Sequence, residues 1–192
     1  VAHAYDFLDN LLFIISGSEV GVLSSILGNP ESPLFGRAYA EVTTRRLSRG
    51  ESLKFLQRGF SEVGINVDEH EIERAVDRLD GIIGWLTYYG YSRSIGGRDL
   101  DSIVSDAVSM ARQELENFLK SRASRRYRVV LRLLASGVRE WGLLKRRLED
   151  YEGSRISDRV LHDILTALKR HSIIDEDLDF TDPVVREAAR GL

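Results

Sequence analysis

The pattern of apolar and polar positions changes character near residue 50. Residues 11–16, with the sequence LLFIIS, form a continuous apolar run that stops at Gly17. Such a run predicts a strand that is buried on both faces of a parallel sheet. A loop rich in glycine, proline and serine follows at residues 28–33, and residues 39–43 alternate weakly, as a short strand would. The first 50 residues therefore predict part of an α/β layer.

From residue 51 onward the apolar positions repeat with the period of a helix. The first apolar stripe consists of Leu53, Leu56, Phe60 and Val63. Asp68 and Glu71 have the spacing of a capping box and precede a second stripe. Residues 83–91 predict a third helix, residues 92–98 predict a loop, and Asp99 or Asp101 is expected to cap a long fourth helix. Four helices in this order predict a small bundle over residues 51–120.

The last seventy residues have a different layout. Residues 129–134 predict one apolar helix and residues 140–151 a second, and Ser157 is expected to cap a third. Ile173-Ile174 and Phe180-Thr181 flank an acidic turn and predict a hairpin. Three helices followed by a small hairpin are the layout of a winged helix-turn-helix.

Composition and motifs narrow the possible chemistry. The 192 residues are 43% hydrophobic and 30% charged with a net charge of −3, which is typical of a globular protein without a membrane span. The absence of cysteine excludes disulfides and thiolate metal sites. No glycine precedes a lysine, so a Walker A loop is absent, and the G-x-S-x-G hydrolase motif is absent as well. The acidic residues 68–71 fit a solvated helix start better than a metal site, because consecutive helical residues point in different directions.

One candidate phosphate site remains at the end of the predicted strand. Ligands of open α/β sheets bind beyond the carboxyl ends of the strands, where Ser16 and Ser18 would lie, with Arg37 on a following loop. A hydroxyl group could hold a water or a γ-phosphate, and an arginine could neutralise phosphate charge. On residue types alone, an ordinary turn with a surface arginine is the favoured alternative.

The predicted winged helix offers a candidate nucleic-acid surface. From Lys120 to Arg139, both included, the chain has seven basic residues and no acidic residue. The outward face of the predicted helix 157–170 would present side chains suited to phosphate and base-edge contacts, namely Arg159, His162, Thr166, Lys169 and Arg170. Two aspartates share that face and the wing is acidic, so DNA contact and a protein-docking or structural role are equally supported.

The chain also resembles a known family. The blocks LLFIISGSEVGVL, SPLFGRA, ESLKFLQRGFSEVGI, DGIIGWL and TDPVVREA occur in the order found in archaeal P-loop ATPases of the STAND branch of the AAA+ superfamily. The resemblance implies a mainly α fold with three parts. Residues 1–50 would be the remnant of an α/β ATPase core with its sensor-1 strand, residues 51–120 a helical lid, and residues 121–192 a winged helix-turn-helix domain.

The same resemblance implies roles for individual residues. Ser18, and less directly Ser16, would sense the γ-phosphate, and Arg37 would act as an arginine finger or phosphate sensor. Gly81, Ile83 and Gly84 would belong to the lid motif that packs near the nucleotide base, with Ile83 standing where the family has proline.

Walker A and Walker B motifs would precede Val1 in such a parent. We therefore expect a cytoplasmic parent that binds ATP and Mg²⁺, whereas the isolated chain would bind no cofactor and be inactive. The leading hypothesis is the lid and winged helix of a nucleotide-dependent switch. The alternatives are a DNA-binding regulator that contacts double-stranded DNA, and a module that docks on a protein partner or on its own ATPase core.

Overall fold

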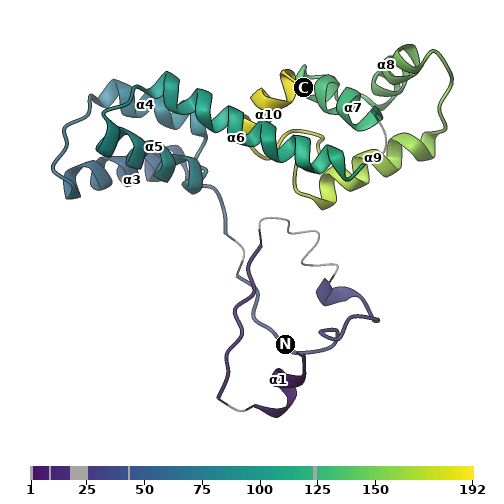
Figure 1. Cartoon of the computed structure of the whole chain (residues 1–192), viewed down its shortest axis with the longest axis horizontal. Coiled ribbons are helices and arrows are strands. Elements are labelled where there is room, and N and C mark those ends of the chain that lie inside the picture. The colour runs from purple at the N-terminus through teal and green to yellow at the C-terminus, as the bar shows by residue number, and fades with distance from the viewer. Residues whose placement is uncertain (1, 9, 18–25, 43, 123–124) are drawn as a thin grey trace.

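The computed structural model describes residues 2–8, 10–17, 26–42, 44–122 and 125–192. It is mainly helical, with 62% of residues in helices and no strand among the described residues. Figure 1 shows an elongated helical body from which the N-terminal segment extends to one side. The labelled helices are α1 (Ala2–Phe7), α3 (Arg49–Glu62), α4 (Glu69–Leu79), α5 (Ile83–Gly96), α6 (Leu100–Lys120), α7 (Arg126–Ala135), α8 (Trp141–Glu152), α9 (Asp158–Arg170) and α10 (Pro183–Arg190).

The strand predicted at residues 11–16 is wrong for this structure. The segment has no regular secondary structure, and Leu12 and Ile14 are each 85% exposed. Residues 39–42 likewise form no strand, and Thr43 lies outside the described residues. A parallel strand forms only by pairing with neighbouring strands, and the described part of this chain supplies none.

The helices of residues 49–120 begin largely where side chains can cap them. Ser48 and Glu51 form a full capping box at α3, with the Glu51 N–H donating to Ser48 Oγ and the Ser48 N–H donating to Glu51 Oε2. Asp68 caps α4 and Asp99 caps α6, as predicted. Glu71 does not complete the predicted box, because its carboxylate instead accepts hydrogen bonds from Tyr89 and Arg93 of α5.

One helix boundary and one capping hydrogen bond differ from the prediction. Residues 92–96, expected in a loop, continue α5 to Gly96, where Gly97 closes the helix in the left-handed conformation (φ 59°). Ser157 stands at the N-cap position of α9, but its side chain makes no capping hydrogen bond.

The winged helix-turn-helix elements are present as predicted, with one addition. Helices α7, α8 and α9 are followed by a hairpin reduced to a single antiparallel bridge between Ile174 and Phe180. The addition is the helix after it, α10, which begins with Asp182 as its cap and Pro183 in its first turn.

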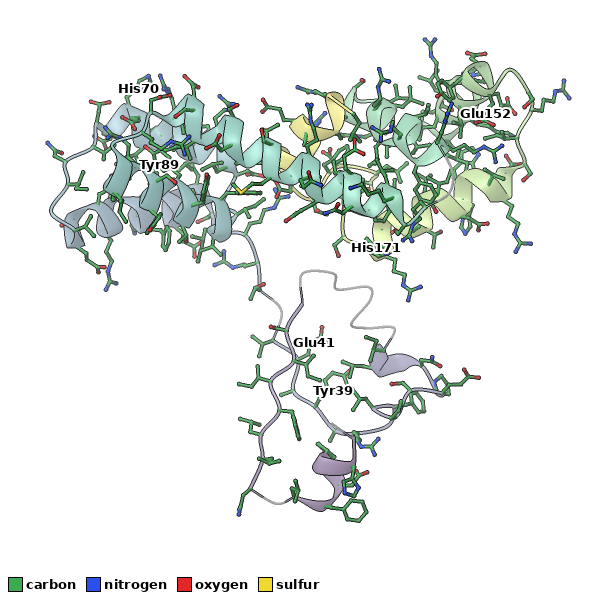
Figure 2. All side chains as sticks on the ribbon, viewed as in Figure 1. Tyr39, Glu41, His70, Tyr89, Glu152 and His171 are labelled. Atoms are coloured by element: carbon green, nitrogen blue, oxygen red, sulfur yellow. The ribbon has the colours of Figure 1, made fainter. Side chains whose placement is uncertain are left out.

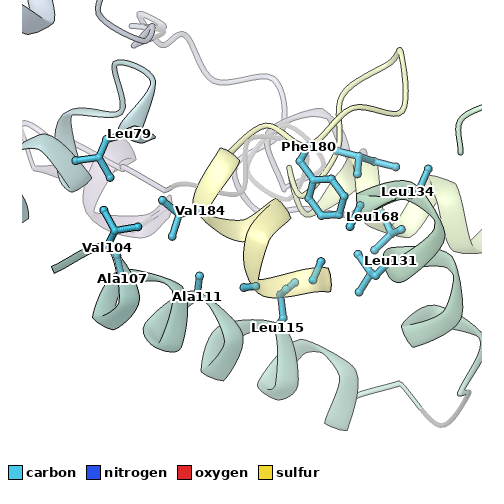
Figure 3. Packing of buried hydrophobic residues seen from close by; sticks show 14 of the residues in the cluster. Leu79, Val104, Ala107, Ala111, Leu115, Leu131, Leu134, Leu168, Phe180 and Val184 are labelled. Carbon is cyan, nitrogen blue, oxygen red and sulfur yellow. The ribbon is translucent and has the colours of Figure 1, made fainter. Parts of the chain in front are cut away.

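Helix α10 packs against helices of both the predicted lid and the predicted winged helix. It packs on α6, α7 and α4, and Val184 and Ala188 are buried. Figure 3 shows Val184 directed toward Leu79 of α4 and toward the small residues Ala107 and Ala111 of α6. Small side chains on α6 allow the close approach of α10, so one apolar cluster runs from the predicted lid into the predicted winged helix.

Candidate functional site

A cavity of about 640 Å³ lies where the N-terminal end of α5, helix α6 and the residues around the wing meet. Its walls come from the predicted lid, from the predicted winged helix and from the chain that enters α3. The lining residues are Gly17, Thr44–Arg46, Gly81–Ile83, Ala111, Glu114, Leu115, Phe118, His171–Ile173, Thr181, Asp182 and Val185. We call this space the junction cavity.

Gly81 fixes the approach of the entering chain to the α4–α5 turn. Its φ is +70°, and a Cβ at this position would lie 2.0 Å from the Leu47 carbonyl oxygen. The Leu47 N–H in turn donates to the Gly81 carbonyl over 2.9 Å. Only glycine combines this conformation with this close contact.

Arg46 connects three parts of the molecule at the edge of the cavity. One guanidinium nitrogen donates to the Asp80 carboxylate in the α4–α5 turn, and another donates to the Thr181 carbonyl beside the hairpin. The segment that leads into α3 is thereby tied both to the lid helices and to the wing.

A second polar contact joins the same two regions. The Trp85 indole N–H in α5 donates to Asp182 Oδ2 over 2.7 Å, in a half-buried position. The other carboxylate oxygen of Asp182 caps α10 by accepting from the Val184 N–H over 2.7 Å. Asp182 therefore holds the start of α10 and the start of α5 together.

Charge at the cavity mouth is largely compensated. Arg45 donates to both carboxylate oxygens of Glu51, over 2.7 and 2.8 Å. These bonds, together with those from Ser48, hold the pKa of Glu51 well below its ordinary value.

One wall of the junction cavity is aromatic. The rings of Phe118 and His171 meet edge to face with centroids 5.1 Å apart, and Arg122 lies over the Phe118 ring at 4.6 Å. An Arg122 Nη also lies 2.8 Å from His171 Nε2. Figure 2 shows His171 at the side of the helical body nearest the N-terminal segment. An aromatic wall of this kind could stack against a planar ring.

The residues predicted to contact nucleotide fall into separate places. Gly81 and Ile83 line the junction cavity, whereas Gly84 is exposed and lines neither this cavity nor the one described next. Ser16 and Arg37 share a different cavity of about 660 Å³ within the N-terminal segment. Ser18 lies outside the described residues.

Arg37 is engaged in a local ion pair. Its Nη2 lies 2.5 Å from Asp6 Oδ2, its Nε donates to Asp6 Oδ1 over 3.1 Å, and it lies over the Tyr5 ring. The hydrogen bonds from Arg37 lower the pKa of Asp6. In the described structure, therefore, Arg37 and Ser16 do not join Gly81 and Ile83 in one site.

The outward face of α9 is exposed, but its charges are paired. Arg159 lies 3.7 Å from Asp163, and Lys169 lies 2.6 Å from Glu176 of the wing. His162 Nε2 lies 3.4 Å from Thr166 Oγ1. Arg170 is exposed at the last position of the helix.

Acidic residues also border the start of this face. Lys145 of α8 lies 2.7 Å from Asp158, and its hydrogen bond lowers the pKa of that carboxyl group. In the wing, the Asp175 carboxylate accepts from the Asp177 and Asp179 N–H groups and so shapes the turn. The acidic wing anticipated from the sequence is thus partly a structural turn.

Several residues of the junction were not predicted. The role of Arg46 depends on partners 34 and 135 residues away along the chain, and the Trp85–Asp182 contact spans 97 residues. The Asp182–Pro183 pair is itself a helix-start signal and would have indicated α10. Among the described residues no cluster of three or more His, Asp or Glu side chains could hold a metal.

Comparison with known proteins agrees with this architecture. Residues 121–179 match the family model of the MCM protein C-terminal winged helix-turn-helix domain. The structure of the Walker-type ATPase PABY2304 of Pyrococcus abyssi is similar over 98% of this chain, with 38% identity and a TM-score of 0.81. The chain spans 55% of that protein, about half its length. No curated protein matches the chain.

These likenesses support the conclusion that the chain is part of an archaeal ATPase and carries a winged helix of the MCM type. Within the described residues, no helix is both long enough and apolar enough to cross a bilayer.

Proposed function

We propose that this chain is the C-terminal part of a cytoplasmic archaeal ATPase of the STAND/AAA+ group, in which it acts as the moving half of a nucleotide-dependent switch. The observation that carries the proposal is the likeness to a Walker-type ATPase over 98% of this chain, although the chain spans only 55% of that protein. Residues 1–50 would then complete the nucleotide-binding core, residues 51–120 would form the lid, and residues 121–192 the winged helix.

The apolar segment at residues 11–15 supports this division. All five side chains are exposed to at least 36% in the described structure, and Leu12 and Ile14 to 85%. Exposing such a continuous apolar run to water is unfavourable. A parallel sheet whose other strands belong to the rest of the protein would cover both of its faces and turn it into a sensor strand.

The junction cavity fits a nucleotide base better than a triphosphate. Ile83 and Val185 provide apolar walls, and Phe118 and His171 provide the aromatic one. In a Walker-type ATPase a glycine-rich loop with a lysine holds the triphosphate, and no glycine precedes a lysine in this chain. The remainder of the protein would therefore hold the phosphates and Mg²⁺, with Ser16, Ser18 and Arg37 near the γ-phosphate.

Residues 44–47, which lead into α3, connect the lid to the winged helix. Arg46 binds both Asp80 of the lid and Thr181 beside the wing, and Leu47 is hydrogen-bonded to Gly81. A displacement of residues 44–47 that accompanies a change of nucleotide would therefore reach the lid and the winged helix together.

Calorimetric titration with Mg-ATP tests the proposal. The 192-residue chain alone should show no tight binding, and the same chain extended with the sequence that precedes it in its gene should bind. Tight binding by the 192 residues alone would contradict the proposal, and so would a longer protein without a Walker A motif.

The second candidate is a winged-helix regulator that uses α9 to contact double-stranded DNA or a protein. The exposure of its outward face favours this candidate, since the Arg159 side chain is 89% exposed. The ion pairs of Arg159 and Lys169 weaken the case for DNA and favour a protein partner or the protein's own core. Salt-insensitive or undetectable DNA binding would exclude the DNA version.

A further inference from the structure

Most of the basic run of the sequence lies on or directly beside α6 and α7, and none of it belongs to α9. Helices α6, α7 and α10 bring together six cations, which we call the arginine face: Arg112, Lys120, Arg125, Arg128, Arg132 and Arg190. Helix α10 packs against both α6 and α7, so the three helices are contiguous.

Contacts between α6 and α7 show that three of these cations are neighbours. Arg128 of α7 donates to both carboxylate oxygens of Glu116 on α6, over 2.8 and 2.9 Å. The hydrogen bonds from Arg128 lower the pKa of Glu116, and the charges of Lys120 and Arg112 add to the effect. One carboxylate is therefore shared among three cations.

Helix α10 extends the same surface. Arg190 Nε donates to the Ala135 carbonyl at the end of α7 over 3.3 Å. The Arg112 guanidinium reaches the residue that follows α10, since a Cβ at Gly191 would collide with it. The surface thus continues from α6 onto the C-terminal end of α10.

Arg125, directly before α7, and Arg132 within it make no ion pair with a described residue. Arg125, Arg128 and Arg132 are spaced i, i+3 and i+7 and so share one side of the helix, while Val130, Leu131 and Leu134 are buried on another. Arg125 and Arg132 are exposed, and no described residue forms a salt bridge with either.

The character of the arginine face distinguishes between kinds of partner. Protein interfaces have apolar, often aromatic centres from which charged residues are depleted. Along α7, α10 and residues 112–120, every large apolar side chain is buried or half-buried, so the cations have no exposed apolar anchor between them. Guanidinium groups bind phosphate oxygens in pairs, and such contacts need no apolar anchor.

We propose that the arginine face binds the phosphate backbone of duplex nucleic acid, independently of base sequence and of the outward face of α9. This assignment does not depend on the ATPase proposal, because it concerns a surface that the 192-residue chain presents by itself.

Fluorescence anisotropy with a labelled DNA duplex of mixed sequence tests this assignment on the full 192-residue chain. The double variant R125E/R132E changes two exposed residues that pair with no described acidic side chain, and circular dichroism should show that it stays folded. We expect its affinity to fall at least tenfold, and the slope of log K against log salt to become shallower by about two.

The matched control is R155E/R159E, which changes the charge equally just before α9 and in its first turn. It should alter the affinity less than twofold. A larger loss in this control than in R125E/R132E would overturn the proposal and restore α9 as the contact surface. Absence of salt-dependent binding by the unmodified chain at low ionic strength would overturn it too, and so would equally tight binding of polyglutamate.

Discussion

Trp85 and Asp182, which are 97 residues apart, meet through a 2.7 Å hydrogen bond from the indole N–H to a carboxylate oxygen. Trp85 belongs to the predicted lid, and Asp182 begins the last helix. The contact therefore spans the boundary at which the two parts of the chain would move relative to each other. In the described structure it holds them in one arrangement.

The Trp85–Asp182 contact can be measured with a double-mutant cycle. Trp85→Phe removes the donor, and Asp182→Asn keeps a side-chain oxygen that can still cap α10. We expect a coupling free energy of about 1.5 kcal/mol in urea unfolding followed by circular dichroism, at the lower end of the range for hydrogen bonds to a charged group. Tyr91→Phe, at an exposed tyrosine, should show no coupling to Asp182→Asn. Additive effects of the first pair would mean that the bond contributes nothing to stability.

Glycine 81 should be intolerant of any side chain. Gly81→Ala places a methyl group against the Leu47 carbonyl at a residue with φ of +70°, so we expect a loss of roughly 2–4 kcal/mol in the free energy of unfolding. Urea denaturation measures this loss.

Gly84→Ala provides the matched control three residues further on. Gly84 lies in the first turn of α5, and a Cβ there meets nothing within 4 Å, so alanine should stabilise the helix by up to about 1 kcal/mol. Equal effects of the two substitutions would show that the close contact at Gly81 is unimportant.

Stability should depend on pH through Glu51. The pKa of this carboxyl group is depressed in the folded protein by Arg45 and by the capping box, whereas its unperturbed value is 4.5. A depressed folded pKa contributes stability above the unfolded value, and this contribution is lost as the pH falls below it. We therefore expect Glu51→Gln to lower the urea midpoint at neutral pH, and to reduce the fall in midpoint between neutral pH and pH of about 3.

Glu62→Gln is the comparison for this pH effect. Glu62 forms an exposed i, i+4 pair with Arg58 at the other end of α3 and caps nothing. The substitution should leave the pH profile close to that of the unmodified protein. An unchanged profile for Glu51→Gln as well would show that the capping box does not bind the charged carboxylate more tightly than water does.

Much of the helical architecture could be predicted because its signals are local. The Asp68 and Asp99 caps, the α6 stripe and the three helices before the wing each depend on residues within a few turns of one another. The contacts of Arg46 with Thr181 and of Trp85 with Asp182 could not be predicted, since nothing near either residue indicates the partner. For the same reason the arginine face could not be predicted, because it forms only when α10 packs against α6 and α7. The strand prediction at residues 11–16 was wrong for the opposite reason. The local apolar pattern is strong, but the described chain contains no strand with which it could pair.

Arg46 should control how tightly the wing follows the entering chain. Arg46→Ala removes the hydrogen bond to the Thr181 carbonyl and the ion pair with Asp80. Both side chains of this ion pair are partly exposed, so the pair adds little to global stability. We expect hydrogen exchange at residues 172–182 to become faster while the urea midpoint changes little. Arg49→Ala is the control, because Arg49 pairs with Glu73 and Asp77 within the helices of the predicted lid. It should leave exchange in the wing unchanged, and equal acceleration in both variants would indicate general loosening instead of a specific connection through Arg46.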